Sequence, residues 1–228
     1  KIKRTPYIVS PRGMLDQWIF KKNRALKQIF WRLYEKTVIQ NASLIHALSA
    51  SEMESVLSLS VSDRVILSPN GVAATVPNRR NWKKPQKHII FIGRIDKKKG
   101  LLELINAWSQ IDIHHGWFLD IYGWGDDKYL EQVKNAIGKH SKNNISYHGE
   151  CYGVKKHEAF LNADAFILPS YSEGLPMAVL EAWAYGLPTL LTAECNLPEG
   201  FSHGASKKIH LDPQKLLEEL KLFFLTTD

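Results

Sequence analysis

From His88 to the end of the chain, short apolar runs alternate with segments whose apolar residues recur at helical spacing. The runs that read as strands are 88–93, 118–123, 144–149, 165–170, 188–192 and 208–211. Helical patterns lie near residues 100–110, 126–141, 153–163, 176–185 and 213–226. Strands that are apolar on both faces and alternate with helices are typical of a parallel, doubly wound sheet. The sequence therefore predicts an α/β fold for this part of the chain.

The segment before His88 shows no such regular alternation. A short strand is predicted at Tyr7–Ser10, and the apolar residues of 23–42 recur at helical spacing with Lys and Arg on the opposite face. Residues 43–49 and 64–72 also read as strands. Because a lone strand cannot form a sheet and the chain opens on one, we expect the start of a domain to be missing here.

Three parts of the chain follow from these patterns. Residues 1–72 are expected to be the C-terminal remnant of an N-terminal domain. Residues 73–87, which are rich in Pro, Asn and basic side chains, are expected to form an interdomain linker. Residues 88–228 are expected to form a Rossmann-like domain. In such a sheet ligands bind beyond the carboxyl ends of the strands, so the residues that follow each strand are the candidates for a site.

The formal net charge of +7 comes from the beginning of the chain. Residues 1–36 hold ten Lys and Arg against two acidic residues, whereas the rest of the chain carries 20 basic and 21 acidic residues. No recognisable nucleic-acid motif interleaves with the basic residues, which argues against a nucleic-acid partner. The basic helix either rests on an anionic membrane surface or packs on a sheet with its charges solvated, and both alternatives stay open.

The cysteines and the apolar runs restrict the class of protein. Cys151 and Cys195 are too few for a disulfide scaffold, and no zinc-type Cys/His spacing occurs. The apolar runs are only a few residues long, so the sequence predicts neither a membrane span nor a signal peptide. These features predict a cytoplasmic protein.

The segment GRIDKKKG follows the first strand of the regular part. It would place Arg94 and Lys99 at the crevice, with Gly100 opening a helix. Two cations and the N–H groups of a helix start could neutralise an anion there. The alternative is that Lys97–Lys99 form a solvated turn.

The segment GWGDD follows the second strand. Two glycines before a helix resemble a phosphate loop, but a tight strand-to-helix turn explains them equally well. No D-x-D pair occurs in the chain, so the usual carboxylate grip on a divalent ion that carries a diphosphate is absent. Cations and backbone N–H groups would therefore have to hold any phosphate.

The segment EGLPMAVLEAWAYGLP follows the fourth strand. Its helix reads as apolar on every side, as in a buried helix, yet it contains Glu181 and begins near Glu173, and these carboxylates need partners. Gly174 and Leu175 could present N–H groups to a diphosphate, and Pro176 suits the first helical position. Because carboxylates beside a diphosphate would repel it, they are better placed to accept hydrogen bonds from sugar hydroxyls. The alternative is that Glu173 is a helix-start charge and Glu181 pairs with a nearby Lys.

Together these segments resemble the retaining glycosyltransferases of family 4, which have the GT-B fold. The resemblance rests on GRIDKKKG and on the two glutamates seven residues apart in EGLPMAVLE, with support from PNGV, YGWGDD and YHGECY. SPRGML followed by a basic helix further resembles the lipopolysaccharide and exopolysaccharide branch. The resemblance implies that this chain carries the C-terminal, donor-binding domain of such an enzyme.

The resemblance also implies roles for single residues. Arg94 and Lys99 would stabilise the departing nucleoside diphosphate, and Glu173 and Glu181 would contact the donor sugar and the ribose. The implied site comprises Arg94, Lys99 and Glu173 for catalysis, and Gly93, Gly149, Glu150, Cys151, Gly174, Leu175, Pro176 and Glu181 for binding a UDP- or GDP-sugar. Arg12 and Gly13 are further candidates, although many relatives have a histidine in the SPRGML segment where this chain has Arg12.

The implied activity is a hexosyl transfer with retention, without a metal or any other cofactor. The acceptor would be a surface polysaccharide or a lipid-linked saccharide, and the enzyme would be cytoplasmic, with peripheral contact to the inner face of the plasma membrane. Two alternatives remain at this stage: a nucleotide-sugar epimerase of the same fold, and a non-catalytic basic module that binds membrane or nucleic acid. The sugar, base, acceptor and linkage depend on loops that vary freely.

Overall fold

The computed structural model describes residues 5–15, 34–60, 62–74, 85–111, 116–140 and 144–226. The chain forms two compact units. The first comprises Lys1–Gly71 together with Glu173–Leu175, and the second comprises Val72–Ser172 and Pro176–Asp228. The linker predicted over residues 73–87 and the basic helix predicted over 23–42 lie largely outside the described residues.

The first unit contains a parallel sheet with the strand order β1-β2-β3. Its strands are β1 (Ile8–Val9), β2 (Leu44–Ala47) and β3 (Val65–Leu67), and its described helices are α3 (Lys36–Asn41) and α4 (Ala50–Ser58). Ile8 of β1 pairs with Leu44 of β2, so the strand at the beginning of the chain is part of a sheet and does not stand alone. The local pattern did not reveal this pairing because it joins residues that are far apart in the sequence.

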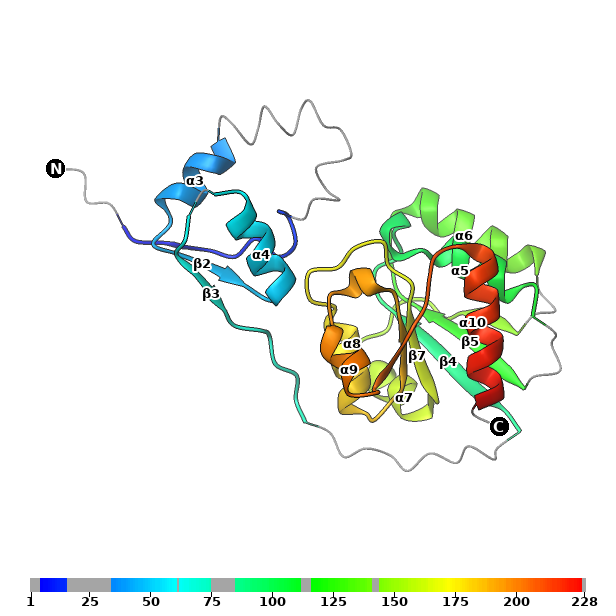
Figure 1. The fold of residues 1–228 in the computed structure, drawn as a ribbon. Helices are drawn as coiled ribbons and strands as arrows, with labels where there is room; N and C mark the ends of the chain where they lie inside the picture. The colour runs from blue at the N-terminus through cyan, green and yellow to red at the C-terminus, as the bar shows by residue number, and fades with distance from the viewer. Residues whose placement is uncertain are drawn as a thin grey trace. The chain divides into compact units, whose positions relative to one another are not determined.

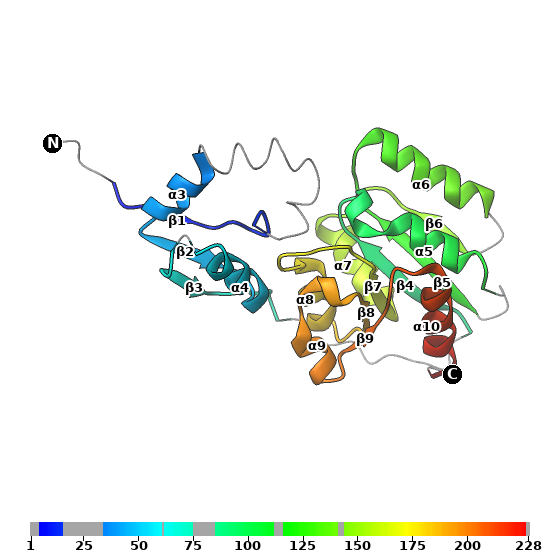
Figure 2. The same cartoon turned by 45° about the horizontal axis from the view of Figure 1, so that its top comes forward.

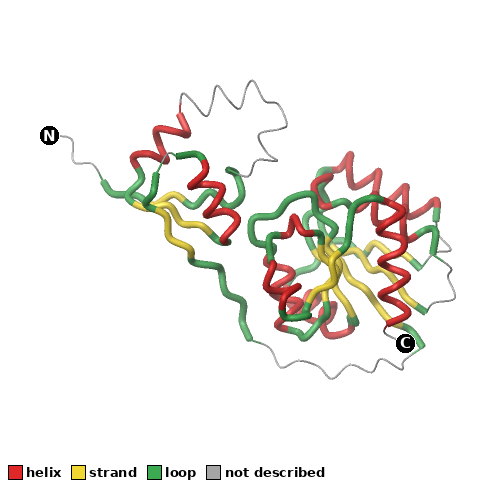
Figure 3. Tube along the Cα trace, viewed as in Figure 1, coloured by secondary structure: helices red, strands yellow, loops and turns green. Residues whose placement is uncertain are grey.

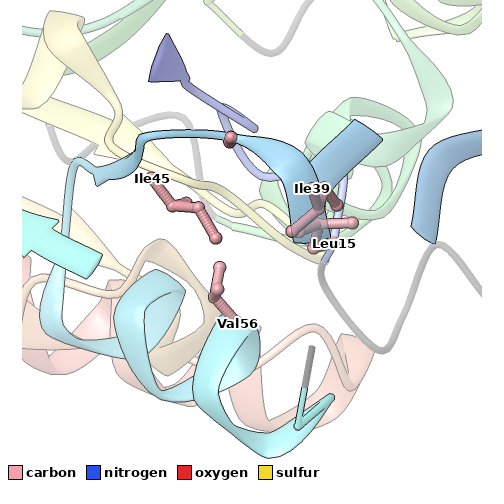
Figure 4. Packing of buried hydrophobic residues seen from close by; sticks show 5 residues of the cluster. Leu15, Ile39, Ile45 and Val56 are labelled. Carbon is pink, nitrogen blue, oxygen red and sulfur yellow. The ribbon is translucent and has the colours of Figure 1, made fainter. Parts of the chain in front are cut away.

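A small apolar core holds the first unit together (Figure 4). Val56 of α4 and Ile45 of β2 lie opposite each other, and Ile39 of α3 lies beside Leu15. All four side chains are buried. Burial of apolar surface of this kind contributes about 25 cal/mol per Å², and it fixes α4 against the sheet.

The second unit contains a six-stranded sheet in which all neighbouring strands are parallel. Its strands are β4 (Lys87–Ile92), β5 (Trp117–Tyr122), β6 (Ile145–Tyr147), β7 (Ala165–Leu168), β8 (Thr189–Leu191) and β9 (Ser206–Lys208). Their spatial order is β6-β5-β4-β7-β8-β9. The chain thus starts in the middle of the sheet, builds outward to β6, and then returns to build the other half from β7. This is the Rossmann order, and the predicted α/β fold with a parallel sheet is confirmed.

Helices cover both faces of this sheet (Figures 1, 2 and 3). One face carries α5 (Leu101–Trp108), α6 (Asp127–Lys139) and α10 (Pro213–Thr226), and the other carries α7 (Gly153–Asn162), α8 (Met177–Ala184) and α9 (Pro198–Ser202). The ring of Trp117 on β5 stacks on Phe224 of α10 at 5.2 Å between centroids, and Trp108 of α5 meets the same ring edge-on at 5.4 Å. These rings join α5 and α10 to the sheet.

Three details differ from the sequence prediction. The last strand is Ser206–Lys208 and not 208–211. Its register with β8 places Ser206 opposite Thr189, and the strand includes the exposed Lys207 and Lys208. Polar, Lys-containing strands are common at sheet edges, where an apolar pattern is not needed. The helix α8 is also not buried on every side, since only Val179 and Ala182 of its residues are fully buried. Pro176 precedes this helix as its N-cap and is not its first residue.

Candidate functional site

The order of the strands creates a switch point between β4 and β7, the place where a doubly wound sheet binds ligands. The segments that follow these two strands lie side by side. Tyr171 donates its backbone N–H to the carbonyl of Lys98 at 2.8 Å, and its hydroxyl donates to Oε1 of Glu103 at 2.8 Å. A side chain at Gly100 would lie 2.1 Å from the carbonyl oxygen of Pro169. The structure thus brings GRIDKKKG and the start of PSYSEGLP together.

The hydroxyl of Tyr171 is a dependable donor in this contact. Burial and the neighbouring carboxylate of Glu103 raise the pKa of Tyr171 to about 12. The group therefore stays protonated at neutral pH and keeps the loop after β7 attached to α5.

The run of lysines after β4 forms a short 3-10 helix, η2 (Lys97–Lys99). Asp96 caps it by accepting a hydrogen bond from the N–H of Lys98 at 2.9 Å. Gly100 then adopts a left-handed conformation with φ of 64° and acts as the N-cap of α5. Lys97 is exposed, as a solvated turn would predict, but Lys99 is half-buried.

Arg94 lies between β4 and η2 and is exposed. In the part of the chain that the structure describes, no residue forms a hydrogen bond or an ion pair with its guanidinium. The exposed guanidinium can therefore meet an anion without breaking a contact among these residues.

The two glycines of GWGDD have a packing role. Side chains at Gly123 and Gly125 would lie 1.8 Å from the carbonyl oxygen of Gly93 and 1.9 Å from that of Ile95. The N–H of Ile95 donates to the carbonyl of Trp124 at 2.7 Å. Only glycine allows the loops after β4 and β5 to approach this closely, so the tight-turn interpretation has a direct physical basis.

The loop after β6 contains Gly149, Glu150 and Cys151, which the resemblance assigns to the binding of a UDP- or GDP-sugar. It is held from two sides. Gly123 donates its N–H to the carbonyl of Gly149 at 2.8 Å, and Nζ of Lys155 donates to the carbonyls of His148 at 2.7 Å and Glu150 at 2.8 Å. Burial raises the pKa of the Cys151 thiol, although the nearby charges of Lys155 and Lys156 oppose this rise.

Glu181 of α8 has a partner on the neighbouring helix. Nζ of Lys156 on α7 lies 2.7 Å from Oε1 and 2.6 Å from Oε2 of Glu181. Only the contact to Oε1 has hydrogen-bond geometry, so the buried Oε2 relies on the ion pair. Both side chains are 30% exposed. The alternative that Glu181 pairs with a lysine therefore describes the structure, and its contact with a ribose stays a prediction.

Glu173, Gly174 and Leu175 connect β7 to α8, and Glu173 is buried. They are grouped with the first unit, as are Arg12 and Gly13. Arg12 is exposed and has a positive φ of 51°.

The N–H of Gly13 is already engaged within the first unit. It donates to Oε1 of the buried Glu52, whose Oε2 accepts from the N–H of Leu48 at 2.7 Å. Sequence reasoning missed this carboxylate. The pattern Ser49-x-x-Glu52 at the start of α4 is the signal that could have found it, since such a pattern marks a helix N-terminus.

Sequence reasoning also missed a cluster on the sheet. Oδ2 of Asp120 lies 2.6 Å from Nδ1 of His88, and its Oδ1 lies 2.6 Å from Nε2 of His148. Burial alone would raise the pKa of Asp120, but the contacts with both imidazoles outweigh it and hold the pKa below 3.8. The cluster joins β4, β5 and the loop after β6. Among the described residues, no group of three or more His, Cys, Asp or Glu is arranged to hold a metal ion.

In the described part of the chain, no helix has both the length and the apolarity that a membrane crossing requires.

Comparison with known families gives a match over residues 74–224, to the family described as "Glycosyl transferases group 1". The match includes the switch point and the segments after all six strands of the second unit.

Two curated relatives are similar over about half of the chain. An "Uncharacterized 41.2 kDa protein in cps region" from Klebsiella pneumoniae is 29% identical over 127 residues, which are 56% of this chain and 33% of that protein. The "Amylovoran biosynthesis glycosyltransferase AmsK" from Erwinia amylovora is 33% identical over 130 residues, which are 52% of this chain and 30% of that protein. The matched segments thus span about a third of these relatives.

Two solved structures share the fold. Sucrose-phosphate synthase from Thermosynechococcus elongatus has a TM-score of 0.79 at 17% identity, with 99% of this chain and 60% of that chain covered. HepE from Anabaena, solved in complex with UDP and glucose, has a TM-score of 0.78 at 17% identity, with 96% and 62% covered.

Proposed function

The chain belongs to the glycosyl transferases group 1 family, and from this premise we propose that it takes a hexose from a UDP- or GDP-sugar and transfers it with retention, as a member of glycosyltransferase family 4. One observation carries the proposal. Tyr171 and Gly100 join the cationic segment after β4 to the segment after β7 at the switch point of the sheet. A parallel sheet of this order binds nucleotides there.

The diphosphate of the donor would be held by cations and backbone donors. Arg94 is exposed and Lys99 is half-buried next to the N-cap of α5. Two positive charges at this position would stabilise the negative charge that develops on the diphosphate as the bond to the sugar breaks. The backbone N–H groups of Gly174 and Leu175 would add hydrogen bonds to the phosphates. This set of groups needs no metal.

The nucleoside and the sugar of the donor would contact residues beside the diphosphate. Glu181 would accept hydrogen bonds from the ribose hydroxyls, and the backbone of Gly149–Cys151 would line the base. Glu173 would accept hydrogen bonds from hydroxyls of the donor sugar. Carboxylates suit hydroxyl partners because each ionised oxygen only accepts hydrogen bonds.

The acceptor would be a growing surface polysaccharide or a lipid-linked saccharide. The name of the Erwinia amylovora relative refers to amylovoran biosynthesis, and that of the Klebsiella pneumoniae relative to the cps region. Residues 1–36 hold ten basic residues, and this charge would bring the enzyme to the anionic inner face of the plasma membrane.

Calorimetric titration tests the donor site. The chain is titrated with UDP, GDP and several of their sugar conjugates without added metal, beside Glu181→Ala and, as a control, Glu218→Ala on the exposed face of α10. We expect one nucleotide to bind and Glu181→Ala to weaken it by about tenfold or more, the worth of a hydrogen bond to a charged group. Glu218→Ala should bind like the wild type. Folded wild-type chain that binds none of these ligands would contradict the proposed function.

A further inference from the structure

We propose that two consecutive lysines on the first turn of α7 hold the nucleoside half of the site in its binding geometry. Lys155 fixes the loop that lines the base, and Lys156 fixes the carboxylate that meets the ribose. This inference rests on the proposed function and adds to it two positioning residues that contact neither the phosphates nor the sugar.

The contacts of Lys156 are specific to one carboxylate. Its Nζ bridges both oxygens of Glu181, at 2.7 and 2.6 Å. The same Nζ lies over the ring of Phe160, 6.0 Å from its centroid, and this ring stacks on Tyr185 at 5.0 Å. A second contact joins Nδ1 of His157 on α7 to the hydroxyl of Tyr185, the residue that follows α8, at 2.6 Å. The helices are thus joined independently of the ion pair, so loss of Lys156 should free the carboxylate without separating them.

The contacts of Lys155 are with backbone. Its Nζ donates one hydrogen bond to the carbonyl of His148 and another to that of Glu150, one on either side of Gly149. Gly149 has a φ of 74°, a left-handed conformation that glycine adopts readily. The N–H of Gly123 holds the carbonyl of Gly149, and Lys155 holds the carbonyls on either side of it. Lys155 therefore helps to set which way the peptide groups of this loop point, and peptide groups are what a base would contact.

The two roles separate because of helix geometry. Consecutive residues on a helix point about 100° apart, so one lysine reaches back to the loop before α7 and the other reaches across to α8. Both lie close enough to Cys151 for their charges to act on its thiol.

Charge explains why the partner of Glu181 is a lysine. An unpaired carboxylate next to a diphosphate would repel it, whereas the ammonium of Lys156 balances this charge and leaves lone pairs of the carboxylate for hydroxyls. Holding the carboxylate in place before the ligand arrives also lowers the entropy lost on binding.

The test compares ribose preference among variants. The dissociation constants of UDP and GDP, and of their 2′,3′-dideoxy counterparts, are measured for the wild type, Lys156→Met, Lys156→Arg and Lys155→Met. Lys139→Met, an exposed residue at the end of α6, controls for the loss of one positive charge. Thermal unfolding verifies that each variant is folded, and Lys156→Gln replaces Lys156→Met if the latter is not.

We expect the wild type to prefer the ribonucleotide, and Lys156→Met to lose about tenfold of this preference. Lys156→Arg should restore most of it, because arginine keeps the charge and can bridge both oxygens. Lys155→Met should keep the ribose preference but move the ratio of the UDP and GDP dissociation constants toward one. Lys139→Met should change neither ratio.

The failures are distinguishable. A wild-type chain that binds neither UDP nor GDP overturns the proposed function, and this inference with it. A wild-type chain that binds one of them, with the ribose preference unchanged in Lys156→Met, overturns the inference alone. If Lys156→Met weakens the binding of ribonucleotides and dideoxynucleotides by the same factor, the inference is also overturned, since a purely structural role for Lys156 would have that effect.

Discussion

Single residues decide how closely the segments of the second unit can approach. The sequence reveals the spacing of the glycines and the charged runs, but it does not reveal which atoms these residues contact. The need of Glu181 for a partner was predictable from a carboxylate in an apolar helix, whereas its partner Lys156 lies 25 residues earlier, on a different helix. A pairing over that separation leaves no sign in a local sequence pattern. The sequence alone therefore does not decide between the alternatives for Glu181.

Gly100 provides a test at this scale. Gly100→Ala would force a side chain into a left-handed conformation and against the carbonyl of Pro169 at 2.1 Å. We expect a loss of stability of about 2–3 kcal/mol or more, because strain and a backbone clash add. Gly138→Ala is the matched control: nothing lies within 4 Å of its added side chain, and in α6 the change should stabilise the chain by about 0.5–1 kcal/mol. Urea unfolding of both variants gives these values, and an unaltered midpoint for Gly100→Ala would contradict the close contact.

Elements were predictable where burial dictates their pattern. The strands β4, β5, β7 and β8 lie in the interior of the sheet, and their apolar runs located them to within a few residues. The prediction placed the edge strand β9 too late in the sequence, because residues of an edge strand, such as Lys207 and Lys208, need not be apolar. The cluster of His88, Asp120 and His148 could not be predicted, since the register of β4, β5 and β6 brings together side chains 28 and 32 residues apart.

This cluster makes stability depend on pH. The folded-state pKa of Asp120 lies below 3.8, so its carboxylate contributes stability above this value and loses it as the pH falls through the lower, folded-state pKa. Asp120→Asn should destabilise the chain by about 1–2 kcal/mol at pH 7, and its difference from the wild type should shrink below pH 3.8. Urea unfolding across the pH range measures this, with the exposed Asp127→Asn as control. A difference between wild type and Asp120→Asn that stays constant with pH would mean that the carboxylate charge contributes nothing.

At the scale of the whole molecule, alternation of strands and helices predicted the fold class, but not the order of the strands. The reversal after β6, which takes the chain back to the centre of the sheet, leaves no mark in the local pattern. It is nevertheless what creates the switch point between β4 and β7. The sequence therefore predicted only that the candidate site lies at the carboxyl ends of the strands. The topology is what brings the segments after β4 and β7 together there.

The distribution of charge over the whole chain gives a further prediction. Residues 72–228 carry 19 Lys and Arg and 18 Asp and Glu, so the basic excess lies in the residues before them. Vesicles that contain phosphatidylglycerol should bind the chain, and added salt should release it because screening shortens the reach of the charges. Replacing Lys21, Lys22 and Lys27 by Glu should weaken binding at least about a hundredfold, since each basic residue near an anionic surface contributes about 1 kcal/mol.

The matched control makes the same change of net charge on α6, with Lys128, Lys134 and Lys139 replaced by Glu. If the beginning of the chain is what contacts the membrane, this variant should bind vesicles nearly as well as the wild type, because a local surface charge acts only within about a Debye length. Equal loss in the two triple variants would mean that net charge alone governs binding. Equally tight, salt-sensitive binding to plain DNA would favour the nucleic-acid alternative, because counterion release from phosphates acts on any basic surface regardless of the membrane.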